Sequence, residues 1–243
     1  MKLIANIPFA FWFLTLLHRL RPLRGSIHRH VSTGDVLSER RDIRKAEDLF
    51  GDFLVKKAGI RLETTGQENV PEGPVVFVSN HQSYWDIPVF FAAVKSKPFG
   101  FVAKSSLRKI PGFGNWIKDV RSVFIEREDA RASLRAIEEG IGLIRQGFSL
   151  VIFPEGTRSR SDQMGEFKKG SLRLATKAGV PVVPVTLDGT YRAFEESGRI
   201  RPATIKVTIH KAIETKDLGK REAGELAEVV EEIIRKQLEE KSK

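Results

Sequence analysis

The sequence predicts an α/β fold, with a mainly parallel or mixed sheet covered by helices and a helix pair in front of it. Short runs of β-branched and aromatic residues alternate with stretches of helical periodicity from residue 60 onwards. Hydrophobic residues make up 41% and charged residues 30%, which is typical of a folded protein rather than a disordered one. The third observation is an apolar N-terminal segment, which precedes the alternating pattern and predicts the helix pair.

Residues 3–17 are apolar at all but two positions. As a helix they would reach about 22 Å, which is short of the roughly 30 Å hydrocarbon core of a bilayer. Residues Asp35 to Ala58 follow with apolar side chains at helical spacing. We therefore expect residues 1–58 to form two helices that dip into one leaflet, with basic side chains near anionic headgroups. The alternative is an apolar helix that docks on the protein's own core. The basic side chains meant here are Lys2, Arg19, Arg21, Arg24 and Arg29.

Residues 59–243 are expected to form one α/β domain. Glycines 147 and 179 stand where helices of this domain should end. The expected strands are Ile60–Thr64, Val75–Ser79, Phe99–Ala103, Ser122–Ile125, Leu150–Phe153, Val182–Leu187 and Ile205–His210. The expected helices are Ile87–Val94, Asp129–Gln146, Lys169–Ala178 and Arg221–Glu240.

The formal net charge of +10 indicates an anionic partner, such as a lipid surface, an acidic protein or a phosphorylated ligand. The chain has no compact run of five or more basic residues, which argues against a nucleic-acid-binding tail. It has no cysteine, so a thiolate nucleophile and cysteine metal ligands are excluded. The histidines lack the spacing of a metal site, and no metal is predicted.

A polar motif, Asn-His-Gln-Ser-Tyr-Trp-Asp, directly follows the expected strand Val75–Ser79. Pro88 makes a regular helix unfavourable before Asp86 or Ile87, so His81 should lie in the strand-to-helix turn. Such a turn can bring Asp86 to the Nδ1 atom of His81 and leave Nε2 free as a base. The backbone N–H groups of the same turn are expected to stabilise an oxyanion. The structural alternative is that Asp86 caps the helix and His81 is an ordinary turn residue.

A second motif, Phe-Pro-Glu-Gly-Thr-Arg-Ser at residues 153–159, follows another expected strand. Gly156 lets the backbone turn closely around a ligand, and Arg158 offers a planar guanidinium suited to phosphate oxygens. We expect Glu155 to receive a hydroxyl group or to orient an arginine. Lys104 and Arg127 also follow expected strands and are further candidates for phosphate binding, although either can be a surface charge.

These blocks together resemble the glycerolipid acyltransferase family, and the lysophosphatidate acyltransferase group in particular. Residues 80–86 look like the family's H-x4-D signature and residues 153–159 like its F-P-E-G-T-R-S block. Residues 124–127 and 180–185 resemble two further blocks, in the family's order. The resemblance covers roughly residues 75–190 and implies a glycerol-3-phosphate acyltransferase-like fold with a membrane-binding helix pair.

The resemblance also implies roles for the candidate residues. His81 would be the general base and Asp86 its orienting carboxylate. The expected residues of the phosphate and acceptor site are Lys104, Arg127, Glu155, Gly156, Thr157 and Arg158.

The implied reaction is transfer of a fatty acyl group from acyl carrier protein or coenzyme A to the sn-2 hydroxyl of lysophosphatidic acid. The thioester is a co-substrate, and no cofactor is implied. The enzyme would lie on the cytoplasmic face of the inner membrane as a peripheral or monotopic protein. Alternatives that stay open are another lysophospholipid or glycerol 3-phosphate as acceptor, and a non-enzymatic protein that binds anionic lipid.

Overall fold

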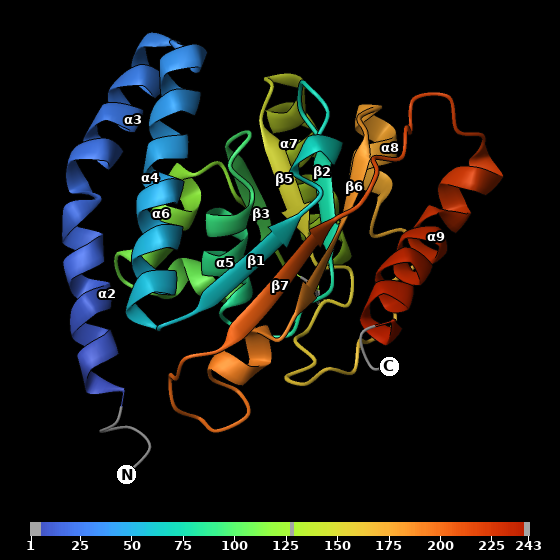
Figure 1. The fold of residues 1–243 in the computed structure, drawn as a ribbon. Helices are drawn as coiled ribbons and strands as arrows, with labels where there is room; N and C mark the ends of the chain where they lie inside the picture. The colour runs from blue at the N-terminus through green and yellow to red at the C-terminus, as the bar shows by residue number, and fades with distance from the viewer. Residues whose placement is uncertain (1–5, 127–128, 241–243) are drawn as a thin grey trace.

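The computed structural model describes residues 6–126 and 129–240. Within these residues one mixed sheet has the strand order β1-β7-β6-β2-β5-β3-β4 (Figure 1). Each expected strand is present, with end points shifted by at most one residue. The strands are β1 (Arg61–Thr65), β2 (Val76–Ser79), β3 (Phe99–Lys104), β4 (Val123–Ile125), β5 (Ser149–Ile152), β6 (Val182–Asp188) and β7 (Thr204–Ile209).

The centre of the sheet consists of parallel strands that are buried on both faces. All four residues of β2 and of β5 are buried, and so are the first six of β6. Strand β2 pairs in parallel with both β5 and β6, and β3 pairs in parallel with β5. The carboxyl ends of these strands therefore meet at one edge of the sheet. Strand β7 is antiparallel to β6, so the sheet is mixed, as predicted.

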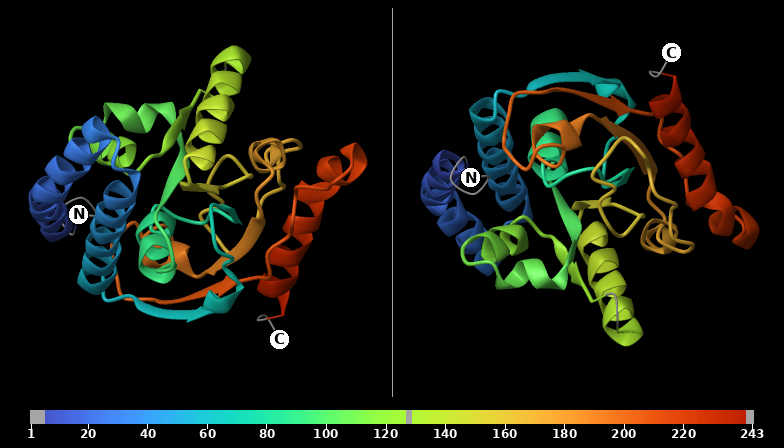
Figure 2. Two further views of the ribbon diagram at one scale, coloured as in Figure 1. Left: turned by 90° about the horizontal axis from the view of Figure 1, so that it is seen from above. Right: turned by 90° about the horizontal axis from the view of Figure 1, so that it is seen from below.

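Helices cover both faces of the sheet, and the two views of Figure 2 show α4 and α5 on one side and α8 and α9 on the other. Helix α4 packs closely on α5, and α9 packs on β6. The expected division of the chain at residue 58 stays a prediction. The helices of the α/β body are α5 (Asp86–Ala93), α6 (Phe113–Asp119), α7 (Ala130–Arg145), α8 (Arg173–Ala178) and α9 (Lys220–Glu239), with short 3-10 turns η1 (Gln67–Asn69), η2 (Ser105–Lys109) and η3 (Thr190–Ala193).

The N-terminal segment forms a helical hairpin. Its first arm is α2 (Ile7–Arg19) followed by α3 (Arg21–Thr33), and its second arm is α4 (Val36–Lys57). Gly34 takes the left-handed conformation, with φ of 71°, and closes the turn between the arms. The expected helix pair is thus present. Leu20 keeps a helical conformation, so the arm continues through the arginine-rich residues as α3.

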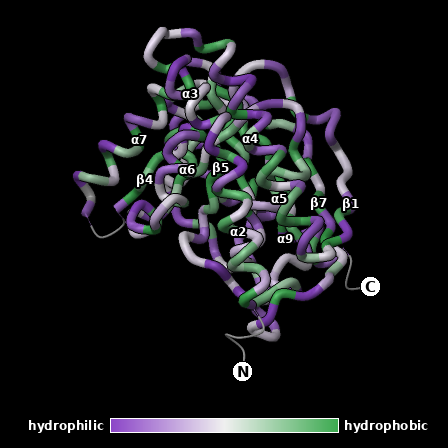
Figure 3. Tube along the Cα trace, turned by 90° about the vertical axis from the view of Figure 1, so that its left-hand side faces the viewer, coloured by the Kyte–Doolittle hydropathy of each residue, from purple (hydrophilic) through white to green (hydrophobic). Residues whose placement is uncertain are grey.

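The two halves of the first arm differ in polarity. Figure 3 shows hydrophobic residues along α2 and mostly hydrophilic residues along α3. The inner side of α2 packs on the body through Phe9 against Trp85 and Phe13 against Phe50. Its outer side leaves Phe11 and Leu14 exposed. No helix among the described residues is both long and apolar enough to cross a membrane.

One local expectation was inaccurate. The helix expected from Lys169 begins only at Arg173, because Gly170 takes a positive φ of 76° and a turn precedes α8. The glycine-rich segment around residue 113 forms the short helix α6. At Gly114 an added Cβ would lie 2.3 Å from the carbonyl oxygen of Arg108, so the absence of a side chain permits this close packing.

Candidate active site

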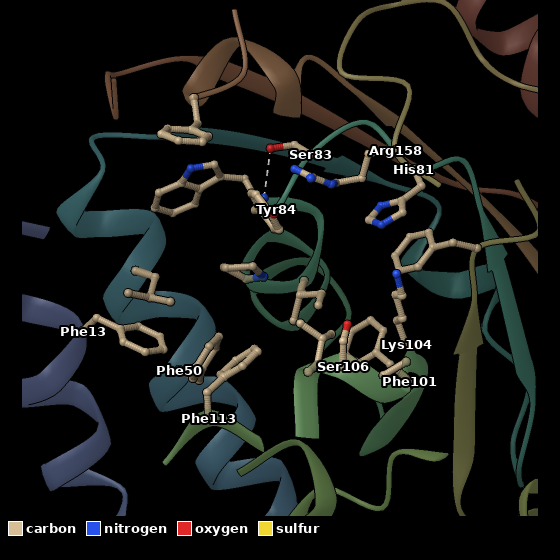
Figure 4. A pocket seen from close by; sticks show the side chains of 18 of the residues that line it. Phe13, Phe50, His81, Ser83, Tyr84, Phe101, Lys104, Ser106, Phe113 and Arg158 are labelled. Carbon is tan, nitrogen blue, oxygen red and sulfur yellow. Dashed lines mark hydrogen bonds between the residues drawn. The ribbon is translucent and has the colours of Figure 1, made fainter. Parts of the chain in front are cut away.

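The candidate site is a pocket of about 750 Å³ at the carboxyl ends of β2, β3 and β5. Figure 4 shows His81, Arg158 and Lys104 on one wall of this pocket and the aromatic rings of Phe13, Phe50 and Phe113 on the other. The polar wall therefore comes from the body, and the apolar wall comes from α2, α4 and α6. The pocket is suited to a ligand with an anionic head and a long apolar tail. Other apolar residues that line it are Phe9, Leu54, Trp85, Phe101, Leu107, Phe153 and Ile200.

His81 and Asp86 form a hydrogen-bonded pair, as the sequence predicted. The Nδ1 atom of His81 lies 2.6 Å from Oδ2 of Asp86. Asp86 is fully buried, whereas the side chain of His81 is 19% exposed and lines the pocket. The imidazole also stacks on the ring of Phe153, with the centroids 4.2 Å apart. The ring is thus held in one orientation, and Nε2 has no protein partner among the described residues.

Asp86 is itself held by donors from two parts of the chain. Its Oδ2 atom accepts hydrogen bonds from the backbone N–H groups of Gln82 (2.7 Å) and Ser83 (3.0 Å). Its Oδ1 atom accepts a hydrogen bond from the hydroxyl of Thr190. These three donors stabilise a carboxylate that has no contact with water.

Thr190 was not among the residues expected from the sequence. It follows β6, whose carboxyl end lies beside that of β2, and this neighbourhood brings it to the site. The side chain of Gln82 links the same two turns, because its Oε1 accepts from the backbone N–H groups of Gly189 and Thr190. A signal was present, since polar residues that follow a third buried strand were candidates by the same reasoning.

Glu155 contacts backbone groups of two loops. Among the described residues no hydroxyl and no arginine donates to its carboxylate, and its expected part in the acceptor site stays a prediction. Its Oε1 atom accepts from the backbone N–H of His81 (2.6 Å), and its Oε2 atom accepts from the backbone N–H of Gly165 (2.9 Å). Burial raises the pKa of Glu155 above its ordinary value, although these two N–H donors oppose the shift. Glu155 therefore joins the loop that follows β5 to the turn that holds His81.

Gly156 adopts the conformation that its motif requires. Its φ is 74°, which other residues rarely adopt, and an added Cβ would lie 2.9 Å from Nζ of Lys168. Lys168 was not expected from the sequence, and it places a further cation beside this loop.

Arg158 lines the pocket but is not a solvated arginine. Its NH1 atom donates to Oε1 of Glu195 at 2.8 Å, and its guanidinium carbon lies 3.4 Å from the ring centroid of Tyr84. The expected role in phosphate binding stays a prediction. Glu195 was missed by the sequence analysis, because it lies in an irregular loop with no motif around it.

The other expected residues differ in position. Lys104, the last residue of β3, is exposed at the pocket, and in Figure 4 its side chain points towards His81. Thr157 lines the pocket and is exposed. Arg127 lies outside the described residues.

The expectation that the turn at His81 supplies oxyanion donors was wrong. The backbone N–H groups of residues 81–84 all donate to carboxylates within the protein. By contrast, those of Thr157 and Arg158, which also line the pocket, have no protein acceptor among the described residues. Within the same described ranges, no group of three or more acidic or histidine side chains is placed to hold a metal ion.

The chain is similar to known acyltransferases in sequence and in structure. The model of the acyltransferase family matches residues 61–188, which include both motifs. The crystal structure of the 1-acyl-sn-glycerophosphate (LPA) acyltransferase PlsC from Thermotoga maritima is similar, with a TM-score of 0.76 and 29% identity. That likeness covers 100% of this chain and 98% of that one.

Several curated relatives are named as 1-acyl-sn-glycerol-3-phosphate acyltransferases. A 1-acyl-sn-glycerol-3-phosphate acyltransferase of Borreliella burgdorferi is 35% identical over 185 residues, which is 75% of this chain and 73% of that protein. One of Pseudomonas aeruginosa is 37% identical over 172 residues, or 70% of this chain and 65% of that protein. One of Chlamydomonas reinhardtii is 40% identical over 152 residues, or 61% of this chain and 45% of that protein. The chain thus spans less than half the length of the algal relative. The matched family model and these identities show that the chain belongs to the acyltransferase family.

Proposed function

We propose that the chain transfers a fatty acyl group from a thioester to the free sn-2 hydroxyl of 1-acyl-sn-glycerol 3-phosphate, giving phosphatidic acid. The observation that carries this proposal is the His81–Asp86 pair, which lies at the junction of a polar and an apolar pocket wall. The names of the relatives support the choice of acceptor.

His81 acts as the general base through Nε2. It takes the proton of the glycerol hydroxyl while the hydroxyl oxygen attacks the thioester carbonyl carbon. The carbon–sulfur bond then breaks, and the imidazolium returns its proton to the leaving thiolate. Asp86 fixes the tautomer of His81 and stabilises the imidazolium that forms between the two steps. The nucleophile is the substrate's own hydroxyl, so the protein needs none.

The oxyanion of the tetrahedral intermediate takes hydrogen bonds from the loop after β5. The backbone N–H groups of Thr157 and Arg158 line the pocket and have no acceptor in the part of the chain that the structure describes. Donors held in place before the reaction stabilise developing charge without reorganisation. The close turn at Gly156 lets this loop approach the ligand.

The acceptor's phosphate binds between Arg158 and Lys104, both of which line the polar wall. The aromatic wall formed by Phe13, Phe50 and Phe113 takes apolar chain. Either acyl carrier protein or coenzyme A suits the +10 net charge as donor, since the one is acidic and the other carries phosphates. No cofactor is required by this scheme.

The outer side of α2 brings the pocket to the membrane. Ile7, Phe11 and Leu14 are 60%, 68% and 64% exposed and lie at helical spacing on one side. The inner side of the same helix lines the pocket. A lysolipid that leaves one leaflet therefore has a short path to His81, and we propose a peripheral or monotopic enzyme on the cytoplasmic face of the inner membrane.

A panel of donors and acceptors tests the proposed reaction. Purified protein is given labelled acyl-CoA or acyl carrier protein thioester together with lysophosphatidic acid, lysophosphatidylcholine, glycerol 3-phosphate or no acceptor. We expect phosphatidic acid as the main product and release of one thiol for each ester formed. Product formed only with another acceptor would change the substrate, and vesicle binding without any ester product would favour a lipid-binding protein.

A further inference from the structure

Glu195 is a buried carboxylate at the edge of the pocket to which neither motif nor proposed chemistry gives a role. It follows η3, and its side chain is only 5% exposed. Its Oε2 atom accepts from the hydroxyl of Ser83, and its Oε1 atom accepts from the backbone N–H of Tyr84 at 3.0 Å and from NH1 of Arg158 at 2.8 Å. A single carboxylate thus contacts the turn that holds His81 and the arginine of the second motif.

The loop that carries Glu195 is fixed at a second point. The side chain of Asn6, at the start of α2, donates to the carbonyl oxygen of Gly198 and accepts from the backbone N–H of Ile200, both at 3.1 Å. Glu195 is therefore held by Ser83, Tyr84 and its own loop, independently of Arg158. A carboxylate fixed in this way can determine where the guanidinium lies.

Arg158 is restrained from two directions. Glu195 accepts a hydrogen bond from the terminal nitrogen NH1 of Arg158. The ring of Tyr84 covers one face of the guanidinium, whose central carbon lies 3.4 Å from the ring centroid. A guanidinium has five N–H donors, and Glu195 is the only acceptor of a hydrogen bond from this side chain among the described residues. Most donors of Arg158 thus stay available to a ligand in the pocket.

We infer that Glu195 is a positioning residue, which holds Arg158 so that its remaining donors face the phosphate of the acceptor. This inference depends on the proposed function for the identity of the acceptor. A carboxylate also repels a nearby anion. The alternative is therefore that Glu195 competes with the phosphate of the acceptor for Arg158. Positioning is favoured because Ser83 and Tyr84 hold the carboxylate in place and because the guanidinium keeps unused donors.

The first test measures Glu195→Ala and Glu195→Gln with lysophosphatidic acid and with a monoacylglycerol, which lacks the phosphate. For Glu195→Ala the acceptor KM for lysophosphatidic acid should rise about tenfold or more, which corresponds to the loss of hydrogen bonds to a charged group. The kcat, the donor KM and the KM for monoacylglycerol should change by less than about threefold. Glu195→Gln retains an oxygen acceptor and should restore part of the loss. The matched control is Glu196→Gln, because Glu196 is exposed and pairs only with Arg201 among the described residues.

A double-mutant cycle adds a readout that a structural role would not change. If Glu195 acts through Arg158, then Glu195→Ala should add almost nothing to the acceptor KM in an Arg158→Ala background. Additive effects, a fall in acceptor KM, or equal losses with and without the phosphate would each overturn the inference.

The dissociation constant of lysophosphatidic acid in mixed micelles, measured by calorimetry, separates the two proposals. If the unmodified chain forms no phosphatidic acid but Glu195→Ala still weakens binding about tenfold, the proposed reaction fails and the positioning role stands. If the reaction proceeds and binding is unchanged, the positioning role fails alone.

Discussion

The Nδ1 atom of His81 lies 2.6 Å from the buried Oδ2 atom of Asp86, five residues along the chain. On a continuous helix these side chains would point about 140° apart, so the turn between β2 and α5 is what brings them together. Asp86 is the first residue of α5, and His81 stays in the turn before it. The pair therefore exists because the helix begins after His81.

Asp86→Asn should lower kcat by on the order of 10² to 10⁴-fold, because an amide does not hold the imidazole in the same tautomer. Steady-state kinetics checks this, with circular dichroism to confirm folding. Thr190→Val is the matched control, since it removes one donor to Asp86 but keeps the carboxylate. It should lower kcat by less than about tenfold. An Asp86→Asn variant with nearly normal kcat would remove the carboxylate from the mechanism.

Gly156→Ala should destabilise the protein by about 1–2 kcal/mol, because its φ of 74° is in the left-handed region, which a residue with a Cβ adopts at a cost. Acyl transfer should also fall, since the loop carries Arg158. Chemical denaturation measures the free energy of unfolding. Gly142→Ala is the control, because Gly142 lies in α7 with nothing within 4 Å, and it should be neutral or stabilise by about 0.5–1 kcal/mol. Equal effects of the two substitutions would contradict the structure of this turn.

Glu47 in α4 gives a dependence of stability on pH. Burial raises its pKa from 4.5 to about 8, against the opposing effects of Arg44 and the backbone N–H of Phe99. Between these two pH values the folded state retains a proton that the unfolded state releases, so stability should fall as the pH rises. Glu47→Gln lacks this titration. The melting temperature of Glu47→Gln minus that of the unmodified chain should therefore increase from pH 5 to pH 8. A difference that stays constant over this range would mean that Arg44 keeps the carboxylate ionised.

The exposed side of α2 should bind membranes. The double substitution of Phe11 and Leu14 by glutamate should lower binding to anionic phosphatidylglycerol vesicles about tenfold or more, since it removes two side chains from the apolar face. Sedimentation with vesicles measures the bound fraction. The control is the double substitution by glutamate of Leu134 in α7 and Val229 in α9, whose side chains are about half exposed on other helices. Equal losses in both double variants would show that α2 has no special part in membrane binding.

Sequence reasoning located the strands because buried β-branched runs are a local signal. It placed His81 and Asp86 together for a similar reason, since Pro88 fixes where the helix can begin. It also gave the edge of the sheet at which polar residues gather. The two motifs and Lys104 all come at the ends of predicted strands.

Contacts that depend on distant parts of the chain could not be derived in this way. Thr190 contacts Asp86 across 104 positions, and Glu195 contacts Ser83 across 112. The antiparallel direction of β7 is likewise set by its pairing with β6 and not by its own residues. For α3 a signal existed, because Leu20, Leu23 and Ile27 recur at helical spacing, but arginine and glycine around them concealed it.

The most direct test of the account is acyl transfer by His81→Ala. The variant should retain its fold, since the ring lies at the pocket wall and the backbone N–H of residue 81 can still donate to Glu155. We predict that the rate of phosphatidic acid formation from lysophosphatidic acid and an acyl thioester falls by at least about 10³-fold while circular dichroism shows that the variant stays folded. A folded His81→Ala variant with turnover within about tenfold of the unmodified chain would contradict the role of His81 as the base.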